Sequence, residues 1–351
     1  MKRSKLVVVG IGPIGAAHLA VLRKKQDFGE VELGICSRNP KVLAGDLTEV
    51  PKNNLGIEVP NCYDTTRVST YSSFEECLGD SSVTGVLICT PTATHYEMAR
   101  RAMKAGKHVL VEKPACIKPG EVENFRQLLG EHPGIVCGVG QVLPYFYDFF
   151  ALRRLLTGKT GITLELNRFV YANNPISSPE MADQIGSAWM DLAVHDLHLA
   201  RSMFGWPAAE PTILERISYS GYVRRVKVQW TFPGNNTVVV DAGVKDDQQE
   251  PFWHGFSGDV DGRRFEYRLG WEGVRYSTTP DDSHPVPEWD DSRFAGSDVP
   301  FAGEHHDFLK GIEQGELSKG CALDPHAALD AVTLALQAQT FVPSLSYVRN
   351  G

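Results

Sequence analysis

Residues 6–15 read Leu6-Val-Val-Val-Gly10-Ile-Gly12-Pro13-Ile14-Gly15. The apolar run that precedes Gly10 is typical of a strand buried on both faces of a parallel sheet. The helix-forming residues of 16–25 predict a helix, and the apolar run 31–36 predicts the next strand. The order strand, glycine-rich turn, helix and strand indicates the start of a doubly wound α/β domain.

The three glycines of this turn have separate physical roles. Gly10 permits a tight turn, Gly12 lets the backbone approach a pyrophosphate, and Gly15 allows the helix to pack closely on the strand. Pro13 and Ile14 lie at the start of the helix, where backbone N–H groups and the helix dipole favour phosphate. A glycine pattern alone is a weak signal, but its strand and helix context favours dinucleotide binding. We therefore expect residues 10 and 12–15 to contact the cofactor.

The end of the second predicted strand bears on the choice of cofactor. An acidic side chain at this point would bind the adenosine ribose of NAD, but the chain has Ser37 and Arg38 there. A hydroxyl and a guanidinium suit a 2′-phosphate, so we expect both to bind NADP in preference to NAD. The alternative is that Arg38 is a solvated loop residue and that NAD binds through other contacts.

Residues 41–70 are rich in proline, glycine and asparagine and indicate an irregular surface excursion. The doubly wound pattern then resumes with a buried strand at 83–90, which opens onto a loop. Ligands of such folds bind at the carboxyl ends of the strands. The loop is therefore expected to contact the cofactor through Thr90, Pro91, Thr92 and His95.

A lysine follows the next predicted strand, which runs from His108 to Glu112. Pro114 restricts the backbone of Lys113 to extended conformations, so the lysine projects from a fixed base. Most lysines are solvated surface charges, but this one ends a strand at the ligand-binding edge of the sheet. We expect Glu112 and Lys113 to line the nicotinamide pocket, and Lys113 to take part in redox chemistry.

A second group of polar residues lies on a helix predicted to begin near Ser187 and to end before Gly205. At about 100° per residue, Asp191, His195 and His198 fall on one stripe, which we interpret as the wall of a cleft. An aspartate four residues before a histidine can orient the imidazole for proton transfer. A surface ion pair on the helix explains the same spacing equally well.

Composition limits the classes of partner. A chain of 351 residues exceeds what one core usually organises and favours two domains. The net charge of −8 argues against a nucleic-acid partner, and no apolar run is long enough to span a membrane. Seven scattered cysteines without a CxxC pair indicate neither a disulfide framework nor a zinc ribbon and suit a reducing, cytoplasmic location. His195, His198, His305 and His306 lack the further ligands that a metal site needs, so no metal is expected.

The chain resembles the Gfo/Idh/MocA (glucose–fructose oxidoreductase / inositol dehydrogenase) family. Four blocks carry the resemblance, in the family's order and spacing: Gly10 to Gly15, Thr90-Pro91…His95, Glu112-Lys113-Pro114 and Asp191…His195. The resemblance implies an N-terminal Rossmann domain with a doubly wound parallel sheet and a C-terminal α/β domain built on a large, mostly antiparallel open sheet. We place the first at 1–124 and the second, for substrate and oligomer contacts, at 125–351. The terminal helices, about 304–340, are expected to pack back on the first domain.

Carried over to this sequence, the resemblance implies roles for individual residues. Lys113 would contact the substrate oxygen at the carbon that exchanges hydride, His195 would be the general acid/base, and Asp191 its orienting partner or a further substrate ligand. Gln141 and His198 are further substrate candidates. The chain departs from the family pattern at His198, where many relatives have aspartate, and at Gly186-Ser-Ala-Trp189, where many have a glycine triplet; both departures touch the substrate side. It also lacks the arginine that often follows the position of Gln141, and these changes favour an unusual substrate.

The leading hypothesis is an NADP- or NAD-dependent dehydrogenase acting on a sugar, a cyclitol or a related polyol. One alternative is a redox-neutral, NAD-dependent glycosidase-like enzyme, in which held cofactor oxidises and then restores the sugar. Another is a non-catalytic NAD(P)-binding regulator, although such a protein has no chemical need for Lys113, Asp191 and His195 together. The resemblance further implies a homodimer or homotetramer assembled through the C-terminal sheet.

Overall fold

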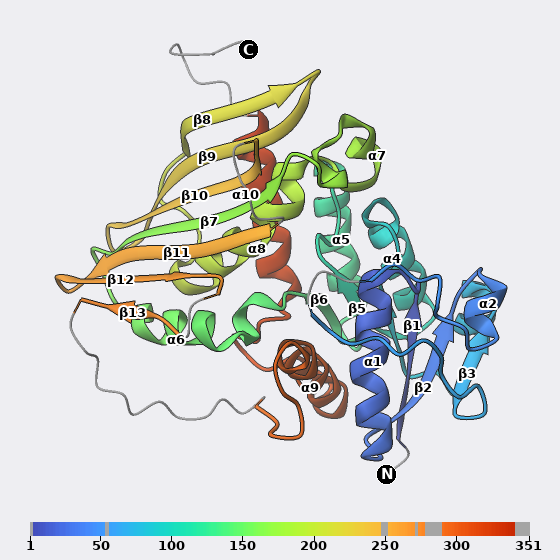
Figure 1. Cartoon of the computed structure of the whole chain (residues 1–351). Helices are drawn as coiled ribbons and strands as arrows, with labels where there is room; N and C mark the ends of the chain where they lie inside the picture. Colours follow the sequence, from blue (N-terminus) through green and yellow to red (C-terminus); the bar gives the residue numbers. More distant parts are fainter. Residues whose placement is uncertain (1–2, 53–55, 247–251, 271–272, 278–289, 341–351) are drawn as a thin grey trace. The chain divides into compact units, whose positions relative to one another are not determined.

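The computed structural model describes residues 3–52, 56–246, 252–270, 273–277 and 290–340. The chain divides into two compact units, each discontinuous in sequence (Figure 1). The first comprises Met1–Cys116, Glu123–Tyr145 and Val286–Pro325, and the second comprises Ile117–Val122, Phe146–Pro285 and His326–Gly351. Within the described part of the chain, no helix is long and apolar enough to cross a membrane.

The first unit contains a six-stranded sheet in the order β3-β2-β1-β4-β5-β6, in which every neighbouring pair is parallel. Its strands are β1 (Ser4–Val9), β2 (Val31–Cys36), β3 (Val68–Tyr71), β4 (Gly85–Ile88), β5 (His108–Glu112) and β6 (Cys137–Gly140). Leu6, Val7 and Val8 of β1 are wholly buried, which accounts for the unbroken apolar run in the sequence. The predicted doubly wound parallel sheet is confirmed.

The helices along this part of the chain are α1 (Pro13–Asp27), α2 (Pro40–Leu43), α3 (Phe74–Gly79), α4 (His95–Lys104), α5 (Pro119–Glu131) and α9 (Asp298–Gln314), with a 3-10 turn, η1 (Thr92–Thr94). Helix α9 packs against α1 within the first unit, although nearly 300 residues separate them in sequence. Strand β6 belongs to the first unit because its backbone pairs with β5. The limits of this unit therefore differ from the single boundary at residue 124.

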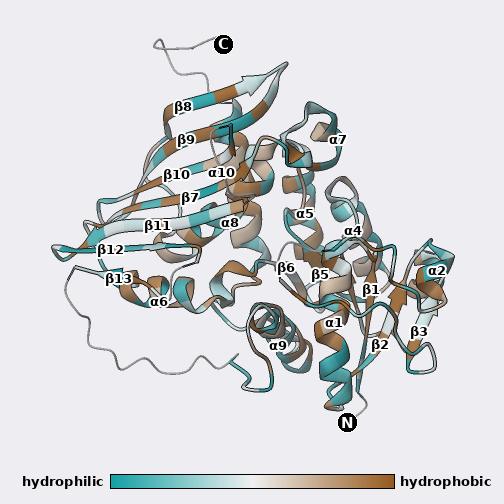
Figure 2. Ribbon diagram, in the orientation of Figure 1, coloured by the Kyte–Doolittle hydropathy of each residue, from teal (hydrophilic) through white to brown (hydrophobic). Residues whose placement is uncertain are grey.

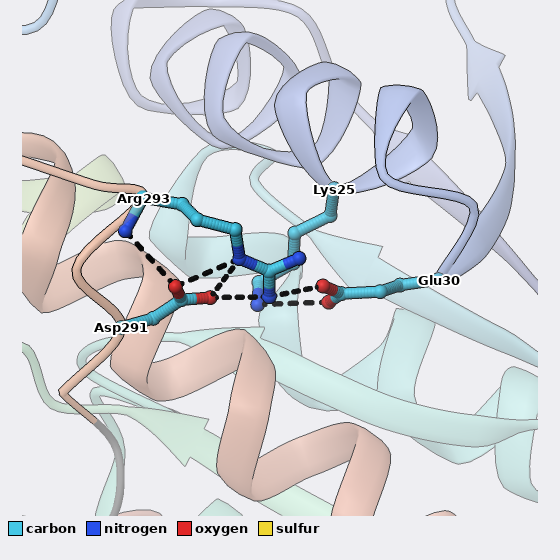
Figure 3. Close-up of polar contacts among 4 residues, drawn as sticks. All are labelled: Lys25, Glu30, Asp291 and Arg293. Atoms are coloured by element: carbon cyan, nitrogen blue, oxygen red, sulfur yellow. Dashed lines mark hydrogen bonds and ion pairs between the residues drawn. The ribbon is translucent and has the colours of Figure 1, made fainter.

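An ion-pair network joins the loop before α9 to α1 (Figure 3). Arg293 pairs with Asp291 and with Glu30, both at 2.5 Å, and Glu30 also pairs with Lys25 at 3.2 Å. The buried Lys25 ammonium lies 5.1 Å from the ring centre of Phe294. Glu30 thus gives the buried Lys25 an anionic partner. Without such a partner, a charge in the core would strongly destabilise the fold.

The second unit contains a seven-stranded sheet in the order β13-β12-β11-β7-β10-β9-β8. Its strands are β7 (Thr163–Tyr171), β8 (Thr212–Tyr219), β9 (Tyr222–Phe232), β10 (Asn236–Lys245), β11 (Phe252–Val260), β12 (Arg263–Arg268) and β13 (Arg275–Tyr276). All pairs are antiparallel except β7 with β10, so the predicted mostly antiparallel sheet is confirmed. Figure 2 shows hydrophobic and hydrophilic residues alternating along β9, as expected for a sheet with unlike faces.

The helices of the second unit are α6 (Tyr147–Leu156), α7 (Ala182–Ile185), α8 (Ala188–Phe204) and α10 (Pro325–Thr340), and short 3-10 turns occur at η3 (Pro175–Ser177) and η4 (Pro179–Met181). A further 3-10 turn, η2 (Leu143–Tyr145), belongs to the first unit. Helix α8 packs against β7, β9 and β10. Most of its residues are buried, so it forms the centre of this unit.

Strands β8 and β9 form a hairpin. The chain reverses at Ser220 and Gly221, which both have positive φ. Tyr219 pairs with Tyr222 across this two-residue turn. A hairpin turn of this kind requires left-handed backbone at both central residues, and Ser-Gly is a weaker signal for it than Asn-Gly.

Candidate active site

The glycine-rich turn lies between β1 and α1. Gly10 has a φ of +88°, and a Cβ atom there would lie 2.9 Å from the side chain of Thr90. A Cβ atom on Gly15 would lie 2.0 Å from the carbonyl oxygen of Gly10, whereas one on Gly12 would meet nothing within 4 Å. Gly10 and Gly15 are thus required by the fold itself. Gly12 leaves open space in front of the α1 N-terminus, where Pro13 and Ile14 begin a helix without an acidic first turn, and this arrangement fits a pyrophosphate.

The end of β2 places Ser37 and Arg38 at the carboxyl edge of the sheet. The Ser37 hydroxyl accepts a hydrogen bond from the backbone N–H of Asn39 at 3.1 Å. Arg38 is exposed, and its guanidinium makes no hydrogen bond or ion pair with any residue that the structure describes. The side chain is therefore available for an anionic ligand at this edge.

The loop after β4 is held together by His95. Its ring nitrogens lie 2.8 Å from the carbonyl oxygens of Pro114 and Thr90, which joins this loop to the one after β5. Burial lowers the pKa of His95, and the two carbonyls oppose that effect in part. Pro91 and Thr92 are more exposed than His95. His95 thus shapes the cofactor edge, while its direct contact with a cofactor stays a prediction.

Lys113 leaves the sheet immediately after β5 and is partly exposed. Its backbone N–H donates to the Glu112 carboxylate at 3.2 Å, and the peptide bond to Pro114 is cis. Glu112 pairs in register with Gly140 of β6, so Gln141 follows at the same edge of the sheet. The structure therefore brings Lys113 and Gln141 to adjacent strand ends. Gln141 is buried, and its amide oxygen has no hydrogen-bond partner within the described ranges.

Helix α8 carries the second group. Ser187 caps its N-terminus by accepting a hydrogen bond from the backbone N–H of Met190 at 2.9 Å. Asp191 and His195 are half-buried one turn apart. His198 is only 1% exposed, and neither ring nitrogen has a hydrogen-bond partner among the residues described. Burial, with smaller contributions from nearby arginines, lowers the pKa of His198 to about 3. This environment weighs against the direct substrate contact expected of His198.

A buried ion pair that the sequence analysis missed anchors α8. Arg168 of β7 donates two hydrogen bonds to Asp196, at 2.9 and 3.0 Å, and both side chains are buried. Breaking such a pair by removing one partner typically costs about 3–5 kcal/mol. Asp196 adjoins His195, so the pair fixes the rotation of the helix that presents His195. In the sequence, the only sign of this ion pair was Arg168 itself, a charged residue directly before the apolar residues Phe169 and Val170.

A second group that the analysis missed lies in the first unit. His18, Glu112 and Glu304 place one possible metal-ligand atom each within 4.8 Å of one another. The His18 Nε2 and Glu112 Oε1 atoms, however, are 2.8 Å apart. Two ligands of a tetrahedral zinc would be separated by about 3.3 Å, given bonds of about 2.0 to 2.1 Å. A direct hydrogen bond therefore accounts for the geometry better than a metal.

Comparison with known proteins agrees with this geometry. Residues 4–141 match the family model described as an oxidoreductase family with an NAD-binding Rossmann fold. Over these residues, which make up less than half of the chain, the protein is similar to the Gfo/Idh/MocA oxidoreductase family. The first unit is thus an NAD(P)-binding Rossmann domain, and the turn at Gly12 fits the pyrophosphate of such a cofactor.

Among the curated relatives, scyllo-inositol 2-dehydrogenase (NAD(+)) of Bacillus subtilis is 30% identical over 133 residues, which cover 37% of this chain and 38% of that protein. Myo-inositol 2-dehydrogenase of Thermotoga maritima is 25% identical over 246 residues, or 68% and 67% of the two chains. The matches span 38–56% of the length of the first four curated relatives. The solved structure of UDP-N-acetylglucosamine 3-dehydrogenase GnnA from Acidithiobacillus ferrooxidans has a similar fold, with a TM-score of 0.70 at 20% identity, covering 96% of this chain and 97% of that one.

Proposed function

We propose that this protein is an NAD(P)-dependent oxidoreductase that transfers a hydride between nicotinamide and a secondary alcohol or ketone of a sugar, a cyclitol or a related polyol. The observation that carries the proposal is the position of Lys113, a partly exposed cation at the carboxyl end of β5 in an NAD-binding Rossmann domain. Ligands of this fold bind at that edge. The inositol dehydrogenases among the relatives support the substrate class.

The proposed chemistry divides two tasks between side chains. Hydride leaves the carbinol carbon as its hydroxyl proton departs, so the reaction needs a proton carrier and a group that stabilises the oxygen. An unperturbed histidine titrates near pH 6.5, about four units below lysine. His195 is therefore assigned the proton transfer, Asp191 the orientation of its ring, and Lys113 the stabilisation of the developing alkoxide. Gln141 is kept as a further substrate ligand.

The cofactor supplies the hydride chemistry, and the first unit would hold it. The turn at Gly10, Gly12 and Gly15 would bind the pyrophosphate, and the strand-end residues Ser37 and Arg38 the adenosine ribose. NADP is the preferred form because the available Arg38 guanidinium can pair with a 2′-phosphate.

The proposal is tested with a panel of aldoses, their uronic acids and inositols, assayed with NAD and with NADP in both directions by nicotinamide absorbance. At least one compound is expected to give multiple turnovers of free cofactor. A product formed without net cofactor change would indicate the redox-neutral alternative. Binding of cofactor without turnover of any compound would favour the regulator.

The assignment of Arg38 predicts a change in cofactor preference. Arg38→Ala is expected to weaken NADP binding by about 10-fold or more, because one charge-assisted hydrogen bond to phosphate is lost, and to leave NAD binding within about 2-fold. Fluorescence titration of each cofactor measures both constants. Arg3→Ala, which removes an exposed guanidinium just before β1 at the opposite edge of the same sheet, is the control. Equal losses for the two cofactors would remove the basis for preferring NADP.

Assembly and location stay proposals. A homodimer or homotetramer through the seven-stranded sheet is supported by the packing of α8 on one face and by charged residues on the strands, among them the Lys227–Glu165 ion pair at 2.8 Å. A cytoplasmic location is supported by all seven cysteines being unpaired thiols. A carbohydrate-like small molecule is the proposed partner.

A further inference from the structure

A chain of polar side chains lies buried in the first unit behind Lys113. His18 projects from α1, Glu112 ends β5, and Glu304 and His305 lie on α9. His18 and His305 are 1% and 0% exposed, and Glu304 is 0% exposed. Four ionisable groups in one solvent-excluded place are costly unless they satisfy one another. We call His305, His18 and Glu112 the histidine relay.

The hydrogen bonds of the relay run in one direction. His18 Nε2 lies 2.8 Å from Glu112 Oε1, and His18 Nδ1 lies 2.8 Å from His305 Nε2. A carboxylate only accepts, so His18 donates through Nε2–H. In a neutral ring, Nδ1 of His18 is then an acceptor, and His305 donates to it through Nε2–H. The remaining nitrogen, His305 Nδ1, has no hydrogen-bond partner among the described residues. With the proton of His305 on Nε2, Nδ1 carries no hydrogen, and burying an unpaired acceptor costs less free energy than burying an unpaired N–H group.

The surroundings of these groups determine which of them carry a charge. Burial lowers the pKa of His305 well below its usual value, so His305 is neutral. Burial raises the pKa of Glu304 well above its usual value, and the nearby Glu112 carboxylate adds to this effect. Burial also opposes ionisation of Glu112, but its hydrogen bond with His18 and its attraction to neighbouring cations hold its pKa below the usual value. Glu112 is thus the single anion of the group.

Glu112 connects the relay to Lys113. One carboxylate oxygen accepts from His18, and the other accepts from the backbone N–H of Lys113 at 3.2 Å. The Glu112 carboxylate packs closely against Gly140, where a Cβ atom would lie 2.9 Å from Glu112 Oε1. Both oxygens are therefore engaged, and the carboxylate cannot rotate without losing a partner. We propose that His305 and His18 are positioning residues, which hold Glu112 and through it the backbone of Lys113 in the orientation that the reaction requires.

The proposal rests on the proposed role of Lys113, but it has a readout that needs no turnover. Slow reductive methylation followed by peptide mass spectrometry gives the modification rate of Lys113 in the folded protein. His305→Leu removes the partner of His18 Nδ1, so the His18 ring loses the contact that fixes its orientation against Glu112. We expect the modification rate of Lys113 to change at least about 3-fold, and kcat for the best substrate to fall by about 10- to 100-fold with a smaller change in KM, as for a displaced catalytic group.

Two further variants separate positioning from general packing. His305→Gln keeps an N–H donor near the same place and is expected to recover most of the Lys113 rate and of kcat. His306→Leu alters the neighbouring histidine, which is partly exposed and makes no hydrogen bond or ion pair with described residues, and it is expected to leave both values unchanged. A folded His305→Leu variant with Lys113 reactivity and kcat like those of the wild type would overturn the proposal and leave the relay a packing feature.

The relay can also be read in the unaltered protein. Nitrogen-15 shifts of the His18 ring are expected to show a proton at Nε2 and none at Nδ1. A proton at Nδ1 would overturn the proposal even if no variant folds. If no polyol is turned over, the proposed function fails, but the Lys113 rates and the His18 tautomer still decide whether the relay positions this lysine.

Discussion

Replacing Lys113 by methionine is expected to lower kcat/KM by about 100- to 1,000-fold, the range found when one preorganised donor to a developing oxyanion is removed. Methionine has a similar length and no charge, so the change removes the proposed electrostatic stabilisation and little packing. NADP affinity, measured by fluorescence titration, is expected to change by less than about 5-fold, since the pyrophosphate and adenosine contacts are distant in the chain from residue 113. Steady-state kinetics with the best compound of the panel gives the effect.

Lys104→Met is the matched control. Lys104 is an exposed lysine in the last turn of α4 in the same unit and makes no hydrogen bond or ion pair with a described residue. The Lys104→Met variant should retain full activity. Lys113→Met activity within 10-fold of the wild type would remove Lys113 from the mechanism and with it the observation on which the proposed function rests.

The two proposed roles also differ in their pH dependence. If His195 carries the proton, His195→Gln should abolish the acidic limb of the pH profile of kcat/KM for alcohol oxidation, because that limb reports protonation of the base. Lys113→Met should lower the whole profile and keep the limb. A limb that disappears in Lys113→Met and persists in His195→Gln would exchange the two assignments.

The Rossmann half could be predicted from sequence because its signals are local. A buried parallel strand, a glycine turn and a helix lie within the first 27 residues, and each reflects its own backbone geometry. Strand β3 was missed because it has only four residues and begins within the stretch 41–70 that was predicted to be irregular. That stretch was expected on the surface, yet Leu47 and Tyr63 pack into the core beside β2. Their burial depends on neighbours brought by the fold, which spacing does not show.

Strand β11 illustrates a different limit. Gly255 and Gly258 interrupt its apolar pattern, and glycine usually weakens a strand. In the structure both glycines are required, because a Cβ atom would lie 2.5 Å from the carbonyl oxygen of Tyr267 and 2.3 Å from that of Thr163, respectively. The contact between neighbouring backbones that demands glycine becomes visible only when the strand partners are known.

The candidate site divides in the same way. Gly12, Lys113 and His195 lie in contiguous motifs and could be named from sequence. The histidine relay could not, because His18 and His305 are separated by 287 positions and meet only through the packing of α9 on α1. Helical spacing placed His198 on the stripe of Asp191 and His195, but spacing does not reveal which part of a stripe neighbouring elements cover.

Gly12→Ala and Gly15→Ala are expected to affect different properties, although the two residues are three positions apart in one turn: the first should lower cofactor affinity and the second should lower stability. Gly12 has a φ of −92°, which alanine adopts, and a Cβ atom there meets no protein atom within 4 Å. Gly12→Ala should therefore fold with unchanged stability and lose about 100-fold or more in affinity for NADP and NAD alike, because the methyl group occupies the space that the pyrophosphate needs.

Gly15→Ala should instead lower the free energy of unfolding by about 3 kcal/mol or more, since its Cβ atom would lie 2.0 Å from the Gly10 carbonyl oxygen and the helix must move away from the turn. Urea denaturation measures the stability and fluorescence titration the affinity. Gly79→Ala, at an open position in α3 of the same unit, is the control and should change neither value. Normal cofactor affinity in Gly12→Ala would mean that the pyrophosphate does not cross the turn at residue 12. Because that crossing orients the nicotinamide toward the end of β5, the same result would also separate Lys113 from hydride transfer.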